Sequence, residues 1–546
     1  MDVEQREAQR LELQAQLERS KQRRERNKAG QFATPATLAM DIVTSTRAWL
    51  EPETRLAFLD PAVGRGAFLS AFSRCFPHSQ VHRAVGYEID PSYACVAASL
   101  WEDIAVHIHV ADFTRARPPQ QDSEKFNLLI CNPPYVRHQH PSKEEKRRLC
   151  IASARACGIN ASERCGLYCY FLWIAHDWLA DDGLACWLVP GECMSVHYGQ
   201  QVRDYLLNQV TLLRIHCFAP ADVQFADSLV TSSVIWFKKS PPSPEHCVAF
   251  SSGGTLDAPG QVRTIARENL CQAKKWQALT MAAGAHVFIP HAGGGGERGG
   301  SQPLGRERGT PGLRPDMARC GYRLADLFEI KRGVATGSNG FFVLGPEQIA
   351  QYQLPAEFLF PLLPRARDLS GDEIQADTDG NPIVAKRVFL LACGLAEDVI
   401  KARYPSLWRY LQLGRARGID RMYLCSHRRP WYLQEKRLAP LFVCSYMGRQ
   451  RSASSSPFCF LLNHSRALAT NSYHLLSPRT GLLEALRSDP GVLGELWERL
   501  KSLSVEDLLR EGRTYGGGLH KMEPGELANV LLRDLPEVLR AALEAR

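Results

Sequence analysis

The tetrapeptide Asn132-Pro133-Pro134-Tyr135 follows a run of apolar residues and offers groups that could make a planar amine reactive. An amine bonded to a purine ring is a weak nucleophile, because its lone pair is delocalised into the ring. The side-chain oxygen of Asn132 and the carbonyl of Pro133 can accept both N–H bonds and so localise that lone pair. The prolines make the turn rigid, and Tyr135 offers an aromatic face for a base. A plain strand-ending turn is the alternative, since Asn-Pro often begins turns.

Three acidic residues upstream, Asp60, Glu88 and Asp112, each stand at the end of an expected strand. After the first strand, Asp60-Pro61-Ala62-Val63-Gly64-Arg65-Gly66 leads into a helix, whose N-terminus presents free N–H groups to a ligand. An acid at the end of the second strand suits a ribose diol. Asp112 can accept from an adenine amine, and Phe113 can stack on the ring. The loop lacks the third glycine of a dinucleotide site, and its carboxylate suits a cationic ligand, so S-adenosylmethionine is the expected cofactor.

Alternating strands and helices over residues 30–240 are expected to position these groups. The expected strands are Leu56–Leu59, Ala84–Glu88, Val106–Val110, Phe126–Cys131, Leu184–Val189, Leu212–Phe218 and Thr231–Lys238, with helices such as Tyr168–Leu179 and Gly199–Asn208 between most of them. This alternation predicts an α/β fold with a doubly wound, mostly parallel sheet. Ligands of such sheets lie beyond the carboxyl ends of the strands, and the acids and the tetrapeptide stand at those ends.

The 546 residues divide by composition into four expected parts. Residues 1–28 predict a charged N-terminal helix, which is either solvated, the preferred interpretation, or in contact with a polyanion. Residues 29–240 predict the catalytic domain, and residues 241–320 predict a linker with a flexible Gly-rich loop. Residues 321–546 regain apolar and aromatic residues, which predicts another domain.

Charge and cysteine content constrain partners and location only broadly. The net charge of +8 and the pI near 8.7 fit a polyanionic partner and an Arg-rich proteome about equally. The 17 cysteines are scattered without a CxxC pair, so no metal site is expected and a reducing compartment is favoured. We find no apolar run of about 18 residues and no secretory signal, so we expect a cytoplasmic protein without a membrane span.

These residues together resemble the N6-adenine DNA methyltransferases of restriction–modification systems. The order of the segments is similar to the gamma type, which includes the TaqI-like, Eco57I-type and PstI/BsuBI-type enzymes. The resemblance implies a Rossmann-like class I S-adenosylmethionine-dependent methyltransferase sheet, followed by a C-terminal α+β domain that recognises the DNA target. The cofactor residues that it implies are Thr34, Pro35, Asp60, Gly64, Gly66, Glu88, Asp112 and Phe113. The implied catalytic residues are Asn132, Pro133 and Tyr135, and Tyr135 and Phe225 are the residues expected to stack on the target base.

The implied reaction transfers a methyl group to N6 of adenine in double-stranded DNA, after the base has rotated out of the helix. Stacking on an aromatic residue, worth ~1–3 kcal/mol per base, would offset the cost of unpairing. The resemblance also implies a possible cognate restriction endonuclease and a protein that acts as a monomer. The basic residues expected to contact DNA are Arg137, Lys146, Lys331, Arg332 and Lys521, each with a solvated charge as its alternative.

Other functions fit parts of the pattern. A glutamine-N5 protein methyltransferase shares the tetrapeptide, but it is shorter and lacks a domain after the sheet, and the same argument disfavours a ribosomal RNA methyltransferase. A non-catalytic DNA-binding specificity protein would not need the intact acids. We find no convincing metal-nuclease core. Methylation of cytosine at carbon 5 needs a cysteine nucleophile after a proline, whereas Cys131 precedes Asn132 and is expected in the core.

Overall fold

The computed structural model describes residues 2–20, 30–102, 106–136, 141–194, 199–219, 222, 224–225, 231–273, 276, 279, 321–435, 437–450, 455–515, 518–533 and 535–544. The chain divides into two compact units, Met1–Pro303 with Tyr515–Gly517 and Leu304–Thr514 with Gly518–Arg546. Within these described residues, no helix is long and apolar enough to cross a membrane.

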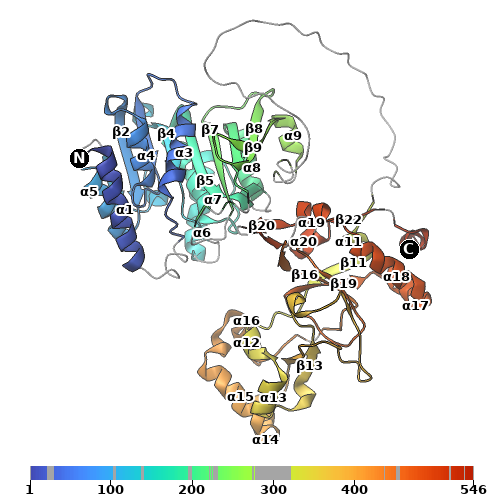
Figure 1. Ribbon diagram of the computed structural model, residues 1–546. Coiled ribbons are helices and arrows are strands. Elements are labelled where there is room, and N and C mark those ends of the chain that lie inside the picture. The colour runs from blue at the N-terminus through green and yellow to red at the C-terminus, as the bar shows by residue number, and fades with distance from the viewer. Residues whose placement is uncertain are drawn as a thin grey trace, which may run out of the picture. The chain divides into compact units, whose positions relative to one another are not determined.

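The first unit contains a nine-stranded sheet with the order β3-β2-β1-β4-β5-β7-β6-β8-β9 (Figure 1). The strands are β1 (Leu56–Asp60), β2 (Val81–Glu88), β3 (Val106–Val110), β4 (Phe126–Cys131), β5 (Leu179–Pro190), β6 (Thr211–Cys217), β7 (Ser232–Lys238), β8 (Cys247–Gly254) and β9 (Pro259–Ala266). The strands from β3 to β5 pair in parallel, whereas β7 is antiparallel to both β5 and β6. The predicted doubly wound, mostly parallel sheet is confirmed.

Helices cover both faces of this sheet, because successive strand side chains point to opposite sides. In β4, Leu128 and Ile130 belong to one hydrophobic core, and Leu129 and Cys131 belong to the other. The first core includes residues of α3 (Ala36–Arg47), α4 (Ala67–Cys75) and α5 (Pro91–Leu100). The second includes residues of α6 (Lys143–Cys157), α7 (Leu167–Ile174) and α8 (Gly199–Asn208). The carboxyl ends of β1 to β4 therefore lie at one edge of a sheet that is covered on both sides.

The prediction that a linker spans residues 241–320 is wrong for its first part, which contains the strands β8 and β9. Strand β8 pairs in parallel with β6, and β9 pairs antiparallel with β8, so the sheet continues to Ala266. Val248 and Phe250 are buried by this pairing, and α9 (Arg267–Gln272) follows. The Pro/Ser-rich segment near residue 240 is only a turn between strands. The Gly-rich stretch of the predicted linker lies outside the described residues.

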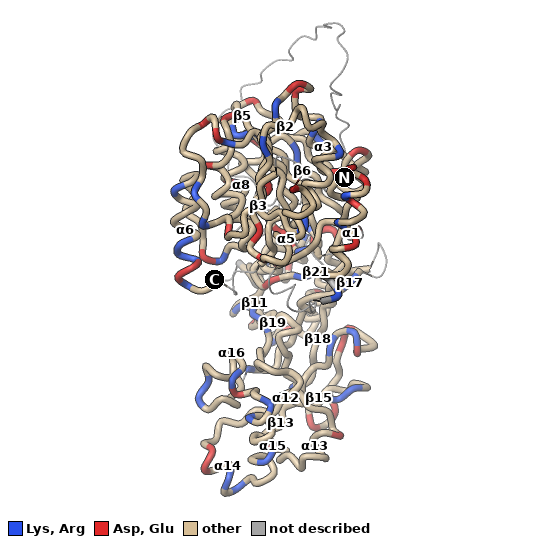
Figure 2. The backbone as a smooth tube through the Cα atoms, turned by 90° about the vertical axis from the view of Figure 1, so that its left-hand side faces the viewer, with Lys and Arg blue, Asp and Glu red and all other residues tan. Residues whose placement is uncertain are grey.

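Helix α1 (Val3–Ser20) packs against α4 and α5, which the expectation of a solvated helix did not include. Arg10 is buried and forms an ion pair with Glu7 at 2.6 Å. Ser70 of α4 donates to the same Glu7 carboxylate. A buried charge is tolerated when it is paired and hydrogen-bonded. The charged sequence of α1 therefore does not reveal that one face of the helix is buried against α4 and α5. Figure 2 shows basic and acidic residues along α1. The remainder of the expected helix, residues 21–28, lies outside the described residues.

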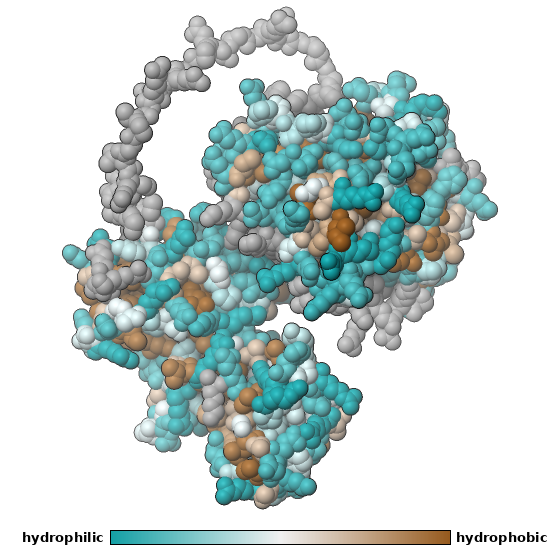
Figure 3. Space-filling view, turned by 180° about the vertical axis from the view of Figure 1, so that it is seen from behind, coloured by the Kyte–Doolittle hydropathy of each residue, from teal (hydrophilic) through white to brown (hydrophobic). Residues whose placement is uncertain are grey.

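The second unit combines small sheets with helices, as the predicted α+β domain requires. Its largest sheet has the order β11-β19-β16-β18-β14, formed by β11 (Phe328–Arg332), β19 (Tyr473–Pro478), β16 (Phe442–Ser445), β18 (Phe460–Asn463) and β14 (Glu373–Ile374). Helices α17 (Thr480–Ser488) and α18 (Pro490–Lys501) contribute to its core. A second core gathers β12 (Val343–Leu344), β13 (Leu359–Leu362), β15 (Val388–Leu391) and α15 (Pro405–Ala416). The face drawn in Figure 3 is largely hydrophilic, with small apolar patches.

Candidate active site

Asn132 stands directly after β4 with its amide held in one orientation. Its Nδ2 donates to the Thr34 hydroxyl at 3.0 Å and to the Phe32 carbonyl at 3.3 Å. Its Oδ1 is buried and has no hydrogen-bond partner among the described residues. A buried acceptor without a partner costs free energy, so this oxygen is suited to a ligand that brings its own N–H.

The segment of residues 30–35 lies against the tetrapeptide, 100 residues away in sequence. The Tyr135 amide donates to the Gly30 carbonyl at 3.3 Å. Gly30 has a φ of +67°, and a Cβ there would lie 2.7 Å from the Tyr135 nitrogen, so only glycine permits this approach. Pro35 caps α3. The resemblance assigns Thr34 to the cofactor, and the structure adds a contact that the sequence analysis missed, the hydrogen bond from Asn132.

Three aromatic rings gather beside Asn132. The ring centroids of Tyr135 and Phe225 are 6.1 Å apart, and Phe32 lies 5.8 Å from Tyr135 and 6.1 Å from Phe225. Phe32 was missed, although an aromatic residue two positions before Thr34 was the available signal. Phe225 is only 3% exposed, so a base that stacks on it must enter between these rings. The Tyr135 hydroxyl donates to the Leu188 carbonyl at 3.1 Å, and burial raises its pKa well above the usual value, so it stays neutral.

The backbone of the loop after β1, which contains Gly64 and Gly66 and is called the cradle below, is held in place by the Glu88 carboxylate. The Gly64 amide donates to Glu88 Oε2 at 3.1 Å, and the Asp90 amide donates to Glu88 Oε1 at 2.8 Å. Burial raises the pKa of Glu88. Gly66 has a φ of +80°, and a Cβ there would lie 2.4 Å from the Trp101 ring, whereas a Cβ on Gly64 would meet nothing closer than 4.0 Å. The cradle is therefore closed behind Gly66 and open at Gly64.

Asp60 is fully buried at the base of this cradle. Its Oδ1 accepts from the Ala62 amide at 3.1 Å. Within the described part of the chain its Oδ2 has no nitrogen or oxygen partner, and the Cys131 thiol is the neighbouring donor. Burial raises the pKa of Asp60 to about 8, so the carboxyl group is mostly neutral at pH 7. Burial also raises the pKa of Cys131 well above the usual value. Cys131 is thus a core thiol, as expected, and not a nucleophile.

The predicted stacking of Phe113 on an adenine ring stays a prediction. The ring is 1% exposed and packs 5.0 Å from Trp178 and 5.6 Å from Phe171, inside the core. Large apolar side chains that are exposed at this edge are instead Ile89, 67% exposed after β2, and Val110, 55% exposed at the end of β3. Neither residue is among those predicted from the sequence, although Ile89 directly follows Glu88.

The five basic residues that are predicted to contact DNA have different surroundings. Arg137 lies outside the described residues, and Lys146 lies on α6. Lys331 is paired with Glu329 at 2.7 Å. Arg332 and Lys521, far apart in sequence, both approach the Tyr446 ring, at 3.8 Å and 5.0 Å from its centroid. Among the described residues, no group of three His, Cys, Asp or Glu side chains is placed to hold a metal ion.

The strand order and the placement of these groups define the class of protein. The sheet is the Rossmann-like class I S-adenosylmethionine-dependent methyltransferase sheet, with an antiparallel β7 between β5 and β6. It carries a Gly-containing loop after β1, an acid at the end of β2 and the Asn-Pro-Pro-Tyr tetrapeptide after β4.

Comparisons with known proteins identify the family within that class. The model of the Eco57I restriction-modification methylase matches residues 92–224, and that of the type II methyltransferase M.Eco57I C-terminal domain matches residues 318–545. The type II methyltransferase M.XamI of Xanthomonas campestris pv. amaranthicola is 28% identical over 517 residues, 93% of this chain and 86% of that protein. M.AccI of Acinetobacter calcoaceticus is 23% identical over 530 residues, with the same coverage of 93% and 86%. The chain belongs to the type II restriction–modification methyltransferases of the Eco57I group.

Solved structures of larger restriction enzymes are also similar. The type IIG restriction endonuclease BpuSI gives a TM-score of 0.41 at 14% identity, covering 94% of this chain and 60% of that one. The type IIL restriction-modification enzyme MmeI, solved in complex with DNA, gives 0.47 at 13% identity, covering 83% of this chain and 60% of that one. This chain thus spans three fifths of the length of each.

Proposed function

We propose that this protein methylates N6 of adenine in double-stranded DNA at a specific sequence, with S-adenosylmethionine as the methyl donor. The observation that carries the proposal is the Asn132 amide, whose nitrogen donates to Thr34 and Phe32 and whose oxygen has no hydrogen-bond partner among the residues that the structure describes. An exocyclic amine supplies the N–H that this oxygen lacks. The side-chain oxygen of Asn132 would accept one N–H, and the carbonyl of Pro133 would accept the other.

Accepting both N–H bonds shifts electron density to the amine nitrogen, which then forms the new bond to carbon. The cofactor, when bound, supplies an electrophilic methyl group on a sulfonium sulfur. The amine would gain this methyl group as the methyl–sulfur bond breaks with its electron pair left on sulfur, and the amine would lose one proton to solvent. No covalent bond to the protein is needed. Tyr135, Phe225 and Phe32 would exclude water from the base and stack on it.

The cradle after β1 fits this cofactor. Gly64 leaves open space, and Glu88 is partly exposed with both oxygens already oriented by backbone amides, which suits a ribose diol. Asp60 offers a buried oxygen without a nitrogen or oxygen partner. A cation bound close to Asp60 would favour the ionised carboxylate, so the sulfonium or amino group of the cofactor and this carboxyl group would stabilise each other.

An adenine in a duplex cannot reach a side chain that lies at the end of a sheet strand, so the base must rotate out of the helix. We further propose that residues 321–544 recognise the DNA target. We also propose that the protein acts as a monomer in the cytoplasm and protects sites that a cognate endonuclease cuts. The M.Eco57I C-terminal domain match to residues 318–545 supports the recognition role, and the match to the Eco57I restriction-modification methylase supports the restriction–modification role.

The test uses purified protein, duplex DNA and labelled S-adenosylmethionine, followed by digestion of the DNA and separation of the nucleosides. The proposal expects label in N6-methyldeoxyadenosine. Label in N4-methylcytosine would refute the choice of base, and label in ribosomal RNA or in a glutamine-bearing release factor, without label in DNA, would refute the DNA substrate.

A further inference from the structure

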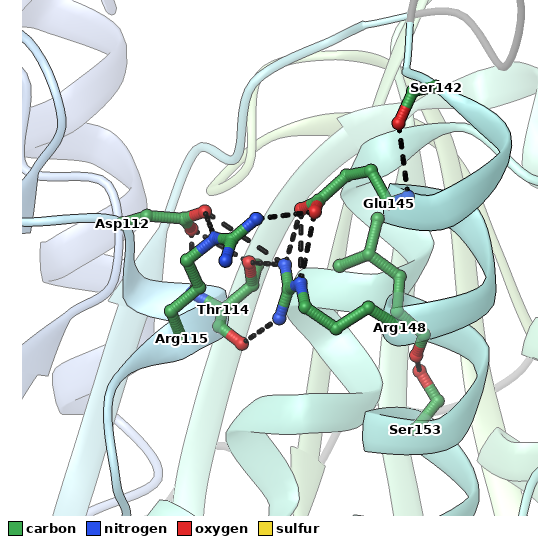
Figure 4. A network of polar contacts seen from close by, with 8 residues as sticks. Asp112, Thr114, Arg115, Ser142, Glu145, Arg148 and Ser153 are labelled. Carbon is green, nitrogen blue, oxygen red and sulfur yellow. Dashed lines mark hydrogen bonds and ion pairs between the residues drawn. The ribbon is translucent and has the colours of Figure 1, made fainter.

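A polar network joins the turn after β3 to the first turns of α6 (Figure 4). Arg148 of α6 uses all three guanidinium nitrogens. Its Nη1 donates to the Thr114 carbonyl at 2.7 Å, its Nη2 to the Thr114 hydroxyl at 2.7 Å, and its Nε to Glu145 Oε2 at 3.1 Å. Arg115 donates to the same Glu145 carboxylate at 2.5 Å. The network therefore spans two segments that are 30 residues or more apart in sequence.

Glu145 is the anchor of the network on α6. Ser142 caps the helix by accepting from the Glu145 amide at 3.2 Å. A glutamate three residues after a serine cap commonly returns its carboxylate to the cap amide, but here the carboxylate turns to Arg115 and Arg148 (Figure 4). The hydrogen bond from Arg148 is the main cause of a lowered Glu145 pKa, so this carboxylate stays charged at neutral pH.

The network ends on Asp112. The Thr114 hydroxyl accepts from Arg148 and donates to Asp112 Oδ1 at 2.7 Å, and the Thr114 amide donates to the same oxygen at 2.9 Å. Arg115 Nε lies 3.3 Å from Asp112 Oδ2. Arg148 Nη2 also lies 3.9 Å from Asp112 Oδ2, so a residue of α6 orients the Asp112 carboxylate both directly and through Thr114.

We propose that Arg148, anchored by Glu145, is a positioning residue that fixes the Asp112 carboxylate to accept from the cofactor's adenine amine. This inference rests on the proposed function. Because α6 follows the catalytic tetrapeptide in the chain, the same network ties the adenine site of the cofactor to the segment that leaves the catalytic loop. Arg148 is not a free phosphate contact, because its donors are directed at Thr114 and Glu145.

The adjacent residue offers a matched control. Arg147 lies one position away on α6 and is exposed, whereas Arg148 is partly buried. Replacing Arg147 removes the same charge from the same helix without touching the network. Arg148→Lys is a conservative variant that keeps the charge but loses the planar fork, which cannot be replaced by a single ammonium group.

The experiment measures binding of S-adenosylhomocysteine and of S-inosylhomocysteine, whose hypoxanthine ring has a carbonyl in place of the adenine amine. Wild-type protein should prefer the adenine form by at least about 10-fold, since the other form lacks the N–H that the charged carboxylate accepts. Arg148→Ala should reduce this preference to less than about 3-fold and raise the KM for S-adenosylmethionine by about 10-fold. Its kcat at saturating cofactor should stay within about 2-fold, because Asn132 is untouched. For Arg148→Lys, the preference ratio and the KM for S-adenosylmethionine should lie between those of wild type and Arg148→Ala. For Arg147→Ala, both should equal those of wild type.

The preference ratio separates a positioning role from a general loss of structure, which would weaken both ligands equally. An unchanged ratio in Arg148→Ala overturns the inference, whether or not the variant is less stable. A raised KM for DNA with an unchanged cofactor KM would instead assign Arg148 to a phosphate contact. If wild-type protein binds neither ligand, the proposed function itself fails.

Discussion

Asp60 makes the apo protein less stable as the pH rises, and Asp60→Asn should remove that dependence. The pKa of the folded carboxyl group is raised from 3.8 to about 8 by burial. Between these values the folded state keeps a proton that the unfolded chain has lost. The free energy of unfolding therefore falls with rising pH through this group, by about 1.4 kcal/mol per pH unit. An asparagine keeps an acceptor for the Ala62 amide and does not titrate.

The magnitude follows from the width of the pH window. Between about pH 5 and about pH 7, the stability of Asp60→Asn relative to wild type should rise by about 2.7 kcal/mol. For a unit of this size that difference corresponds to ~5–10 °C in Tm. Scanning calorimetry at several pH values measures it, and the transition that shifts on adding S-adenosylhomocysteine identifies the catalytic unit.

The control is Asp181→Asn, whose side chain is 90% exposed. This variant removes an exposed carboxylate that pairs with Lys239 at 3.5 Å, so it shows what the loss of a surface charge alone does to stability. If Asp60→Asn and wild type show parallel stability curves, the Asp60 carboxyl group is ionised in the folded protein and the reasoning is refuted. The variant should also bind S-adenosylmethionine more weakly above about pH 7, since it cannot supply a carboxylate to a cation.

Three further predictions test single contacts. Gly30→Ala should reduce kcat/KM by at least about 10-fold, because the added Cβ clashes with Tyr135. The control is Gly158→Ala, which has a φ of +71° and open space around it, and it should cost ~1 kcal/mol of stability without loss of activity. Tyr135→Ala should lower kcat/KM by ~5–150-fold through lost stacking, and Tyr135→Phe should retain most activity; equal losses would assign the effect to the hydroxyl. Glu7→Gln should destabilise the catalytic unit by ~3 kcal/mol in urea unfolding by leaving the buried Arg10 unpaired, and an unchanged midpoint would contradict the buried ion pair.

Elements with strong local patterns could be predicted from the sequence. The bounds of β4 and α8 match the expected Phe126–Cys131 and Gly199–Asn208, because each is a clear pattern bounded by residues that end it. The linker was misplaced because the proline-rich turn before β8 resembles a chain break, although the apolar alternation resumes after it. Strands at the edge of a sheet carry a weaker signal than buried parallel ones.

The site could be predicted only where its residues are local in sequence. The tetrapeptide and the three strand-end acids were visible as motifs. The hydrogen bond from Asn132 to Thr34 and the links from Arg148 to Thr114 join distant segments, so no local pattern encodes them. A motif shows which residue follows a strand but not which way its side chain points, so the burial of the Phe113 ring could not be predicted from the sequence.

The central claim is that the free oxygen of Asn132 activates an adenine amine in DNA. The most direct measurement compares wild type, Asn132→Ala and the exposed control Asn160→Ala for N6-methyladenine formation and for S-adenosylhomocysteine binding. The account predicts a loss of at least about 100-fold in kcat for Asn132→Ala, ~3 kcal/mol in transition-state stabilisation, with cofactor affinity unchanged and Asn160→Ala equal to wild type. Full methylation by Asn132→Ala would contradict it.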